Sequence, residues 1–173
     1  MSKIKLFAEN FLVYGFGGII SKVIPLVMLP VIARLMPDTE YFGISDLTNT
    51  MISLFSALAV MGMYDAMYRM FFEKDDEAYK KDICSTALVF TLAASLLVFV
   101  FMILFRKQLA ACFFGSQSNV FLVYIAAAAT LAGASNSIVC APTRMQNKRK
   151  VFLVTNTLAP VLSYSVSVPL LLA

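Results

Sequence analysis

The amino-acid sequence predicts an all-α, polytopic helical membrane protein. Hydrophobic residues make up 60% of the chain and charged residues 14%, whereas charged residues make up about 25% of a typical soluble domain. The apolar residues also gather in runs of about 20 residues, the length at which a helix crosses a hydrocarbon core about 30 Å thick. Short polar stretches separate these runs. We therefore expect membrane-spanning helices joined by short loops.

Five runs are long enough to cross the membrane as helices. The expected helices occupy residues 7–35, 47–72, 84–105, 120–141 and 151–173, within one transmembrane domain at residues 1–173. The fifth run reaches the final residue with no charged residue behind it. We expect the chain to be part of a larger transporter-like protein, and the alternative is a five-helix protein without a tail.

The distribution of basic residues predicts a cytoplasmic amino terminus. In that orientation most lysines and arginines lie on the inside, as the positive-inside rule requires, and residues 36–43 and 106–119 face outward. The inside residues are Lys3, Lys5, Arg69, Lys74, Lys80, Lys81, Arg144, Lys148, Arg149 and Lys150, and the outside residues are Arg34, Arg106 and Lys107. Glu9 and Asn10 interrupt the first apolar run, which argues against a cleaved signal peptide.

The first expected helix carries a lysine near its centre. Lys22 lies about 16 Å from either end of the otherwise uncharged segment 11–33, at a rise of 1.5 Å per residue. An ammonium at that depth costs roughly 2.5 to 3.5 kcal/mol on insertion scales, so Lys22 should line a polar pathway or serve a structural partner. Pro25 and Pro30 interrupt the same helix and predict kinks or hinges.

Four further charges lie in or beside the first two expected helices. Asp65 and Arg69 are four residues apart with the acid first, the order that favours an ion pair along a helix. Arg34 and Asp46 flank the external turn, where they pair with each other or extend to the lipid headgroups. The alternative is that all four side chains line a cavity together with Lys22, along the polar pathway described above.

The other expected helices carry few polar residues. Helices 84–105 and 151–173 contain no charged residue, and we expect them to be scaffold or lipid-facing helices. In helix 120–141, Ala129, Gly133 and Ser137 recur every four residues. Small residues at this spacing suit close packing of one helix against another.

The composition argues against several classes of function. The chain has no histidine, and Cys84, Cys112 and Cys140 are widely spaced, so neither a histidine-based catalytic set nor a Cys/His metal site is indicated. The glycines at residues 15–18 lack the preceding strand of a phosphate-binding loop. The net charge of +4 comes from loops between apolar runs and reports topology, not nucleic-acid binding. We expect no enzyme activity, no metal and no cofactor.

Several segments of the chain stand in a recognisable order and spacing. They are Asn10, residues 14–18 (YGFGG), Lys22, Leu29-Pro30, Arg34-Leu35, residues 40–44 (EYFGI), Asp46-Leu47, residues 61–73 (MGMYDAMYRMFFE) and residues 84–88 (CSTAL). Together they resemble the amino-terminal part of Wzx-type oligosaccharide flippases, the polysaccharide transporter branch of the multidrug/oligosaccharidyl-lipid/polysaccharide exporter superfamily. The resemblance covers essentially the whole chain and is strongest over residues 10–90.

This resemblance implies a MATE-like fold, of which residues 1–173 match the first part of the amino-terminal lobe. It implies movement of undecaprenyl-pyrophosphate-linked oligosaccharides across the bacterial inner membrane for polysaccharide and lipopolysaccharide biosynthesis. Lys22 would contact the pyrophosphate, and Arg34, Asp46, Asp65 and Arg69 would line the same cavity. The implied partners are the lipid-linked oligosaccharide, membrane lipids, glycosyltransferases and a glycan polymerase.

Two other functions remain open at this stage. A drug or cation antiporter of the same superfamily would favour a membrane-buried acid for coupling, whereas the deepest unpaired charge here is the base Lys22. A non-transporting membrane scaffold or remnant would use its small residues for helix association alone.

Overall fold

The computed structural model describes residues 15, 19, 22–36, 38–146, 151, 154–155, 158, 161–165, 167 and 169. Residues 22–35 are helical, and α2 follows at Thr39–Val60, α3 at Met63–Phe71, α4 at Glu77–Leu104, α5 at Arg106–Phe114, the short 3-10 helix η1 at Gln117–Asn119 and α6 at Val120–Met145. No strand occurs among the residues just given, which confirms the all-α fold class. The chain divides into two compact units, residues 43–145 and residues 1–42 with 146–173.

Among the residues that the structure describes, three helices are long and apolar enough to cross a membrane. They are α2, α4 and α6. The last two coincide with the helices expected at residues 84–105 and 120–141. The first expected helix, 7–35, is described at residues 15, 19 and 22–35, and the fifth, 151–173, at scattered positions from 151 to 169, all of them helical. The rest of these two segments lies outside the described residues.

The second expected helix, 47–72, is two helices instead of one. α2 begins at Thr39 and ends at Val60, and α3 begins at Met63. Between them Met61 and Gly62 have φ angles of 46° and 72°, in the left-handed region that ends a right-handed helix. The Gly62 carbonyl then accepts the first hydrogen bonds of α3 from the backbone N–H groups of Asp65 and Ala66, at 3.1 and 3.2 Å. Hydropathy did not reveal the break because apolar residues lie on both sides of it.

We expect Gly62→Ala to lower the free energy of unfolding by about 1–2 kcal/mol, the cost of a left-handed conformation for a residue with a Cβ. A Cβ at Gly62 meets no atom within 4 Å, so the cost comes from the backbone alone. Gly133→Ala in α6 is the control, because its Cβ would lie 3.9 Å from the Ser56 Oγ, an ordinary contact. Thermal unfolding of the two purified variants in detergent measures their stabilities. Equal stability of Gly62→Ala and Gly133→Ala would contradict the explanation by backbone conformation.

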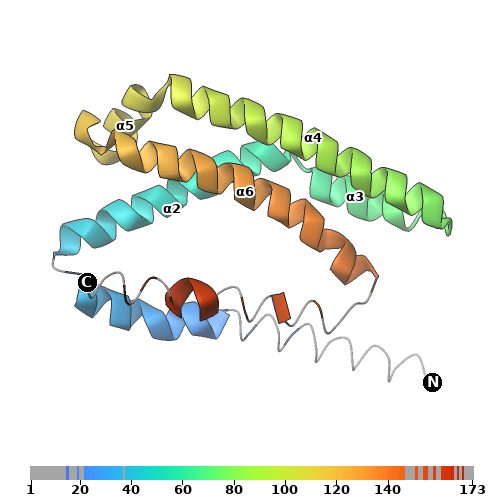
Figure 1. Cartoon of the computed structure of the whole chain (residues 1–173), viewed down its shortest axis with the longest axis horizontal. Coiled ribbons are helices and arrows are strands. Elements are labelled where there is room, and N and C mark those ends of the chain that lie inside the picture. Colours follow the sequence, from blue (N-terminus) through green and yellow to red (C-terminus); the bar gives the residue numbers. More distant parts are fainter. Residues whose placement is uncertain are drawn as a thin grey trace. The chain divides into compact units, whose positions relative to one another are not determined.

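The unit at residues 43–145 is a helical bundle with two hydrophobic clusters. α4 and α6 run antiparallel and pack along their lengths, with α2 and α3 beside them (Figure 1). The first cluster lies toward α5 and is formed by Met51, Phe55, Met102, Ala110, Val123, Ala126 and Ala127. The second lies toward the α3–α4 loop and is formed by Met67, Phe71, Ile83, Ala87, Ile138, Ala141 and Met145. Since lipid tails are as apolar as these side chains, close packing and small residues hold such a bundle together in a membrane.

The packed face of α6 differs from the face that the small-residue spacing indicated. Gly133 and Ser137 are exposed, and Ala129 is half-buried. The buried residues of α6 are Val123, Ala126, Ala127, Thr130, Ala134, Ile138, Ala141 and Met145. The packing face is therefore displaced by about one residue around the helix, and several of its members are also small.

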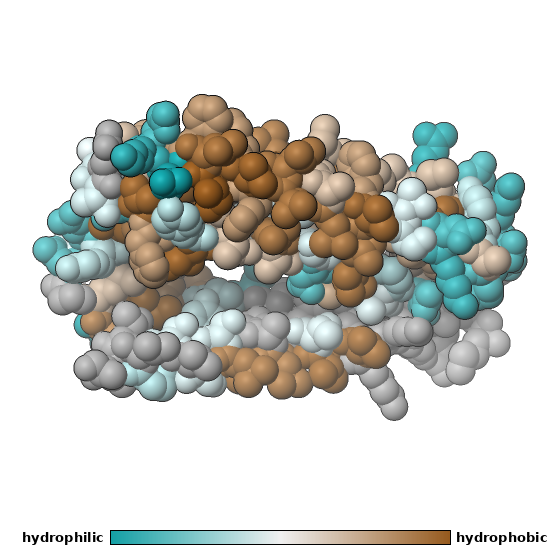
Figure 2. All heavy atoms as spheres, turned by 45° about the horizontal axis from the view of Figure 1, so that its top comes forward, coloured by the Kyte–Doolittle hydropathy of each residue, from teal (hydrophilic) through white to brown (hydrophobic). Residues whose placement is uncertain are grey.

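The surface of this unit has the banded pattern of a membrane protein. Figure 2 shows hydrophobic side chains over the middle of the bundle and hydrophilic ones at both ends. Exposed tyrosines lie toward both ends of the band, with Tyr124 toward α5 and Tyr68 toward the α3–α4 loop. Aromatic side chains favour the membrane–water interface on both sides of a bilayer. The bundle thus has the surface expected of a membrane-spanning domain.

The loop between α3 and α4 is held by local polar contacts. The Asp76 side chain accepts a hydrogen bond from the backbone N–H of Ala78 at 3.1 Å and caps the start of α4. Lys80 donates a hydrogen bond to Asp75, and this bond together with the lysine charge lowers the pKa of the Asp75 carboxyl. These contacts fix the turn that carries the chain from α3 into α4.

Candidate functional site

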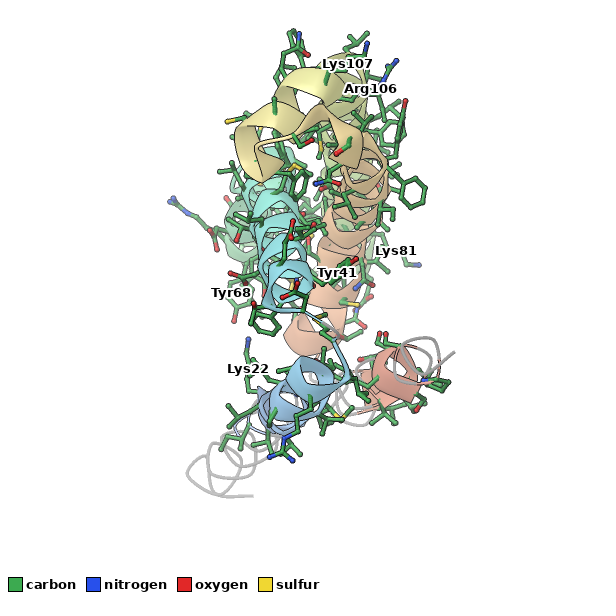
Figure 3. The ribbon with its side chains drawn as sticks, turned by 90° about the vertical axis from the view of Figure 1, so that its left-hand side faces the viewer. Lys22, Tyr41, Tyr68, Lys81, Arg106 and Lys107 are labelled. Carbon is green, nitrogen blue, oxygen red and sulfur yellow. The ribbon has the colours of Figure 1, made fainter. Side chains whose placement is uncertain are left out.

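Lys22 lies on the helix at residues 22–35 with an exposed side chain. Figure 3 shows this side chain extending away from its own helix. Among the described residues of its unit, Lys22 makes no ion pair. Pro25 and Pro30 follow on the same helix, and their role as hinges stays a prediction. The ammonium is thus available to water or to an anion.

Arg34 stands near the far end of the same helix, also with an exposed side chain. Twelve residues of helix separate it from Lys22, which corresponds to about 18 Å along the axis. Lys22 and Arg34 therefore mark two different levels of one helix. A single phosphate group cannot bridge that distance, so any contact of both with one substrate requires an extended ligand.

Asp46, Asp65 and Arg69 lie in the unit at residues 43–145. Asp46 is exposed in the second turn of α2, about 22 Å along the helix axis from the break at Met61. Asp65 and Arg69 are on α3, beyond the break. The fold brings Asp65 and Arg69 together within one helical turn and keeps Asp46 apart from them.

Asp65 and Arg69 do not form the ion pair that their spacing favours. Both side chains are exposed, and neither pairs with another residue of the described ranges. A surface pair of this kind contributes about 0 to 1 kcal/mol, too little to hold two exposed side chains in one geometry. Met67 and Phe71 occupy the inward face of α3, with 1% and 3% of their surface exposed, so Asp65 and Arg69 lie on its outward face.

A hollow follows this outward face of α3. It has a volume of about 640 Å³ and is lined by Ala66, Arg69, Met70, Phe72 and Glu73. Small-molecule sites commonly occupy about 300–1,000 Å³ and combine apolar walls with a few polar groups. Of the residues predicted for the site, Arg69 lines this hollow directly and Asp65 is its neighbour on the helix.

A buried polar layer separates the two hydrophobic clusters, and the sequence did not single it out. Thr91 and Ser95 of α4 and Thr130 of α6 are all fully buried. The Ser95 hydroxyl donates to the Leu92 carbonyl at 3.0 Å, whereas the hydroxyl oxygens of Thr91 and Thr130 have no hydrogen-bond partner among the described residues. On α4, Thr91 and Ser95 follow Ala87 at intervals of four residues, which places all three on one face of the helix. This pattern was not conspicuous in the sequence because the residues around it are strongly hydrophobic. α4 thus carries a buried polar stripe in addition to the exposed apolar residues expected of a scaffold or lipid-facing helix.

The described residues offer little to a metal or to nucleophilic catalysis. Within the ranges that the structure covers, no three Asp, Glu or Cys side chains gather as metal ligands would. Cys84, Cys112 and Cys140 are free thiols. The charged and aromatic side chains that the described residues bring together lie along α3, where they can contact a ligand.

Comparison with known proteins identifies the family of the chain. Residues 7–172 match the model of the family described as Polysaccharide biosynthesis protein. No curated protein and no solved structure matches the chain. Because the match spans nearly the whole chain, the protein belongs to this family. Its members are membrane proteins that generally act as transporters in polysaccharide synthesis.

Proposed function

We propose that this member of the polysaccharide biosynthesis protein family moves oligosaccharides linked through pyrophosphate to undecaprenol from the inner to the outer leaflet of the bacterial inner membrane. The family match over residues 7–172 carries the proposal. The three helices of the described part that are long and apolar enough to cross a membrane support it, as does the banded hydrophobic surface. The positive-inside distribution of lysines and arginines supports a cytoplasmic amino terminus.

Lys22 is the residue proposed to contact the pyrophosphate. Its ammonium is exposed on a helix whose sequence is otherwise uncharged from residue 11 to residue 33. An anionic headgroup supplies the countercharge that a cation at membrane depth needs. Arg34, Asp46, Asp65 and Arg69 are proposed to line the route of the same substrate at other levels.

Alternating access is the proposed mechanism. In transporters built from two lobes, the substrate binds near the middle of the membrane and the lobes rock around it. Pro25 and Pro30 provide points at which the first helix can bend, because proline removes a backbone hydrogen bond. Transport by an antiporter mechanism has weaker support, since the acids Asp46 and Asp65 are exposed and not buried at a coupling site.

Removal of the gene tests the proposed function. We expect lipid-linked glycan to accumulate on the inner leaflet and cell-surface polysaccharide to fall, because synthesis of the glycan continues while its transfer stops. A glycan-cleaving enzyme added to intact spheroplasts reaches only the outer leaflet. The lipid-linked glycan that escapes cleavage therefore lies in the inner leaflet. A plasmid copy of the gene should restore surface display. Normal polysaccharide display in the deleted cells would contradict the proposal.

A further inference from the structure

The outward face of α3 and of the turn after it carries an alternating row of charges. Asp65, Arg69 and Glu73 follow one another at intervals of four residues, and all three side chains are exposed. Asp65 and Arg69 therefore lie above one another on α3, and Glu73 follows in the turn after the helix ends at Phe71. The Glu73 carboxylate also accepts a hydrogen bond from the Tyr79 hydroxyl at 3.4 Å, which holds the end of the row in place.

Two aromatic rings accompany this row. Tyr68 and Phe72 are 47% and 59% exposed, and their ring centroids lie 5.3 Å apart in an edge-to-face arrangement. Tyr68 projects outward from α3 (Figure 3). Phe72 packs in turn against the buried Phe71 ring at 5.4 Å, so the aromatic pair is anchored to the core of the bundle.

The charges on this face do not suit a lipid tail or a pyrophosphate. Three ionised groups at one helix face are costly against hydrocarbon, so the face requires a polar neighbour. Within the row a carboxylate stands on each side of the Arg69 guanidinium, which weakens the attraction of Arg69 for a multiply charged anion. Arg69 is therefore poorly placed to act as the main pyrophosphate contact.

The same groups match the chemistry of a sugar. Carboxylates accept hydrogen bonds and a guanidinium donates them, and a sugar hydroxyl does both. The apolar face of a pyranose ring packs on an exposed aromatic ring, such as those of Tyr68 and Phe72. The open hollow of about 640 Å³ beside Arg69 and Phe72 leaves room for a ligand at this face.

We propose that the face formed by Asp65, Tyr68, Arg69, Phe72 and Glu73 binds the glycan part of the transported lipid and contributes to its selection, while the pyrophosphate binds elsewhere. This inference rests on the proposed flippase function. It assigns glycan binding to the face on α3 and leaves pyrophosphate binding to Lys22. A site that hydrogen-bonds specific hydroxyls rejects ligands that lack them, because its polar groups are then left unpaired.

The test measures lipid binding by the gene product in nanodiscs. One probe is the lipid-linked glycan purified from cells that lack the gene, and the other is undecaprenyl pyrophosphate without a glycan. We expect the double variant Asp65→Asn/Glu73→Gln to raise the Kd for the first probe about tenfold. The Kd for the second probe should stay within about twofold of the wild-type value. Tyr68→Ala should show the same selectivity.

Asp82→Asn is the matched control, since Asp82 is an exposed acid on α4 that does not belong to this face, and it should change neither Kd. Equal weakening of both probes by the α3 variants would overturn the inference and assign the face to pyrophosphate. Unchanged binding of both would also overturn it. If the wild-type protein binds neither lipid, the proposed function itself fails, which separates that failure from failure of the inference.

Discussion

Lys22→Ala is expected to reduce export of the lipid-linked glycan roughly 10- to 100-fold, because a hydrogen bond to a charged group contributes about 1.5–3 kcal/mol and about 1.4 kcal/mol corresponds to a factor of ten. The Lys22 side chain is exposed on its helix and has no ion-pair partner among the described residues of its unit. Its removal should therefore weaken anion binding without disturbing packing. Quantitative labelling of surface glycan, at matched protein levels in the membrane, measures the effect.

Two further variants define the role of the charge at position 22. Lys22→Arg should retain most export, since a guanidinium also binds phosphate oxygens. Lys107→Ala removes an exposed lysine from α5 and serves as the control for a general loss of positive charge. Export that is unchanged by Lys22→Ala would show that this lysine has a structural role only.

Ala127→Leu in α6 is expected to produce the largest loss of stability, about 1–3 kcal/mol or more. Ala127 is fully buried in the first hydrophobic cluster, beside Ala126 and opposite residues of α2 and α4. Three additional carbon atoms cannot be accommodated there without moving the helices apart. The loss appears as a lower unfolding temperature and as earlier unfolding in a denaturant titration of the detergent-solubilised protein.

Ala128→Leu gives the comparison that isolates packing from every other effect. Ala128 is the next residue of the same helix and has an exposed side chain. The substitution adds the same atoms and has the same small effect on helix propensity. We expect stability close to that of the wild type. A comparable loss for Ala127→Leu and Ala128→Leu would show that the buried face of α6 has been assigned wrongly.

The helices that the sequence located best are those with the most uniform apolar character. α4 and α6 begin and end within a few residues of the expected boundaries, apart from the polar first turns of α4 and the last turn of α6. The run at residues 47–72 is less apolar than these two, and it contains the break at Met61 and Gly62. Hydropathy reports how much apolar surface a segment has, and a left-handed residue pair changes that quantity very little.

The sequence names candidate residues for the site, but it does not show how they are grouped. An isolated lysine in an apolar run identifies Lys22, and the spacing of Asp65 and Arg69 places them on one helix face. Their lack of an ion pair, the exposure of Tyr68 and Phe72 beside them and the nearby hollow depend on how Met67 and Phe71 pack against α4 and α6. Such packing fixes which side of α3 is left outward.

The sequence by itself determined that this is an all-α membrane protein with helices at α4 and α6, because the transfer of about 20 uncharged apolar residues from water into a bilayer depends on local composition alone. Only the tertiary structure decided where α2 ends, which face of α6 is buried and where Thr91, Ser95 and Thr130 form a polar layer. In a helix that is apolar on every side, the spacing of hydrophobic residues does not indicate which face is buried. The packing of neighbouring helices determines which face is buried.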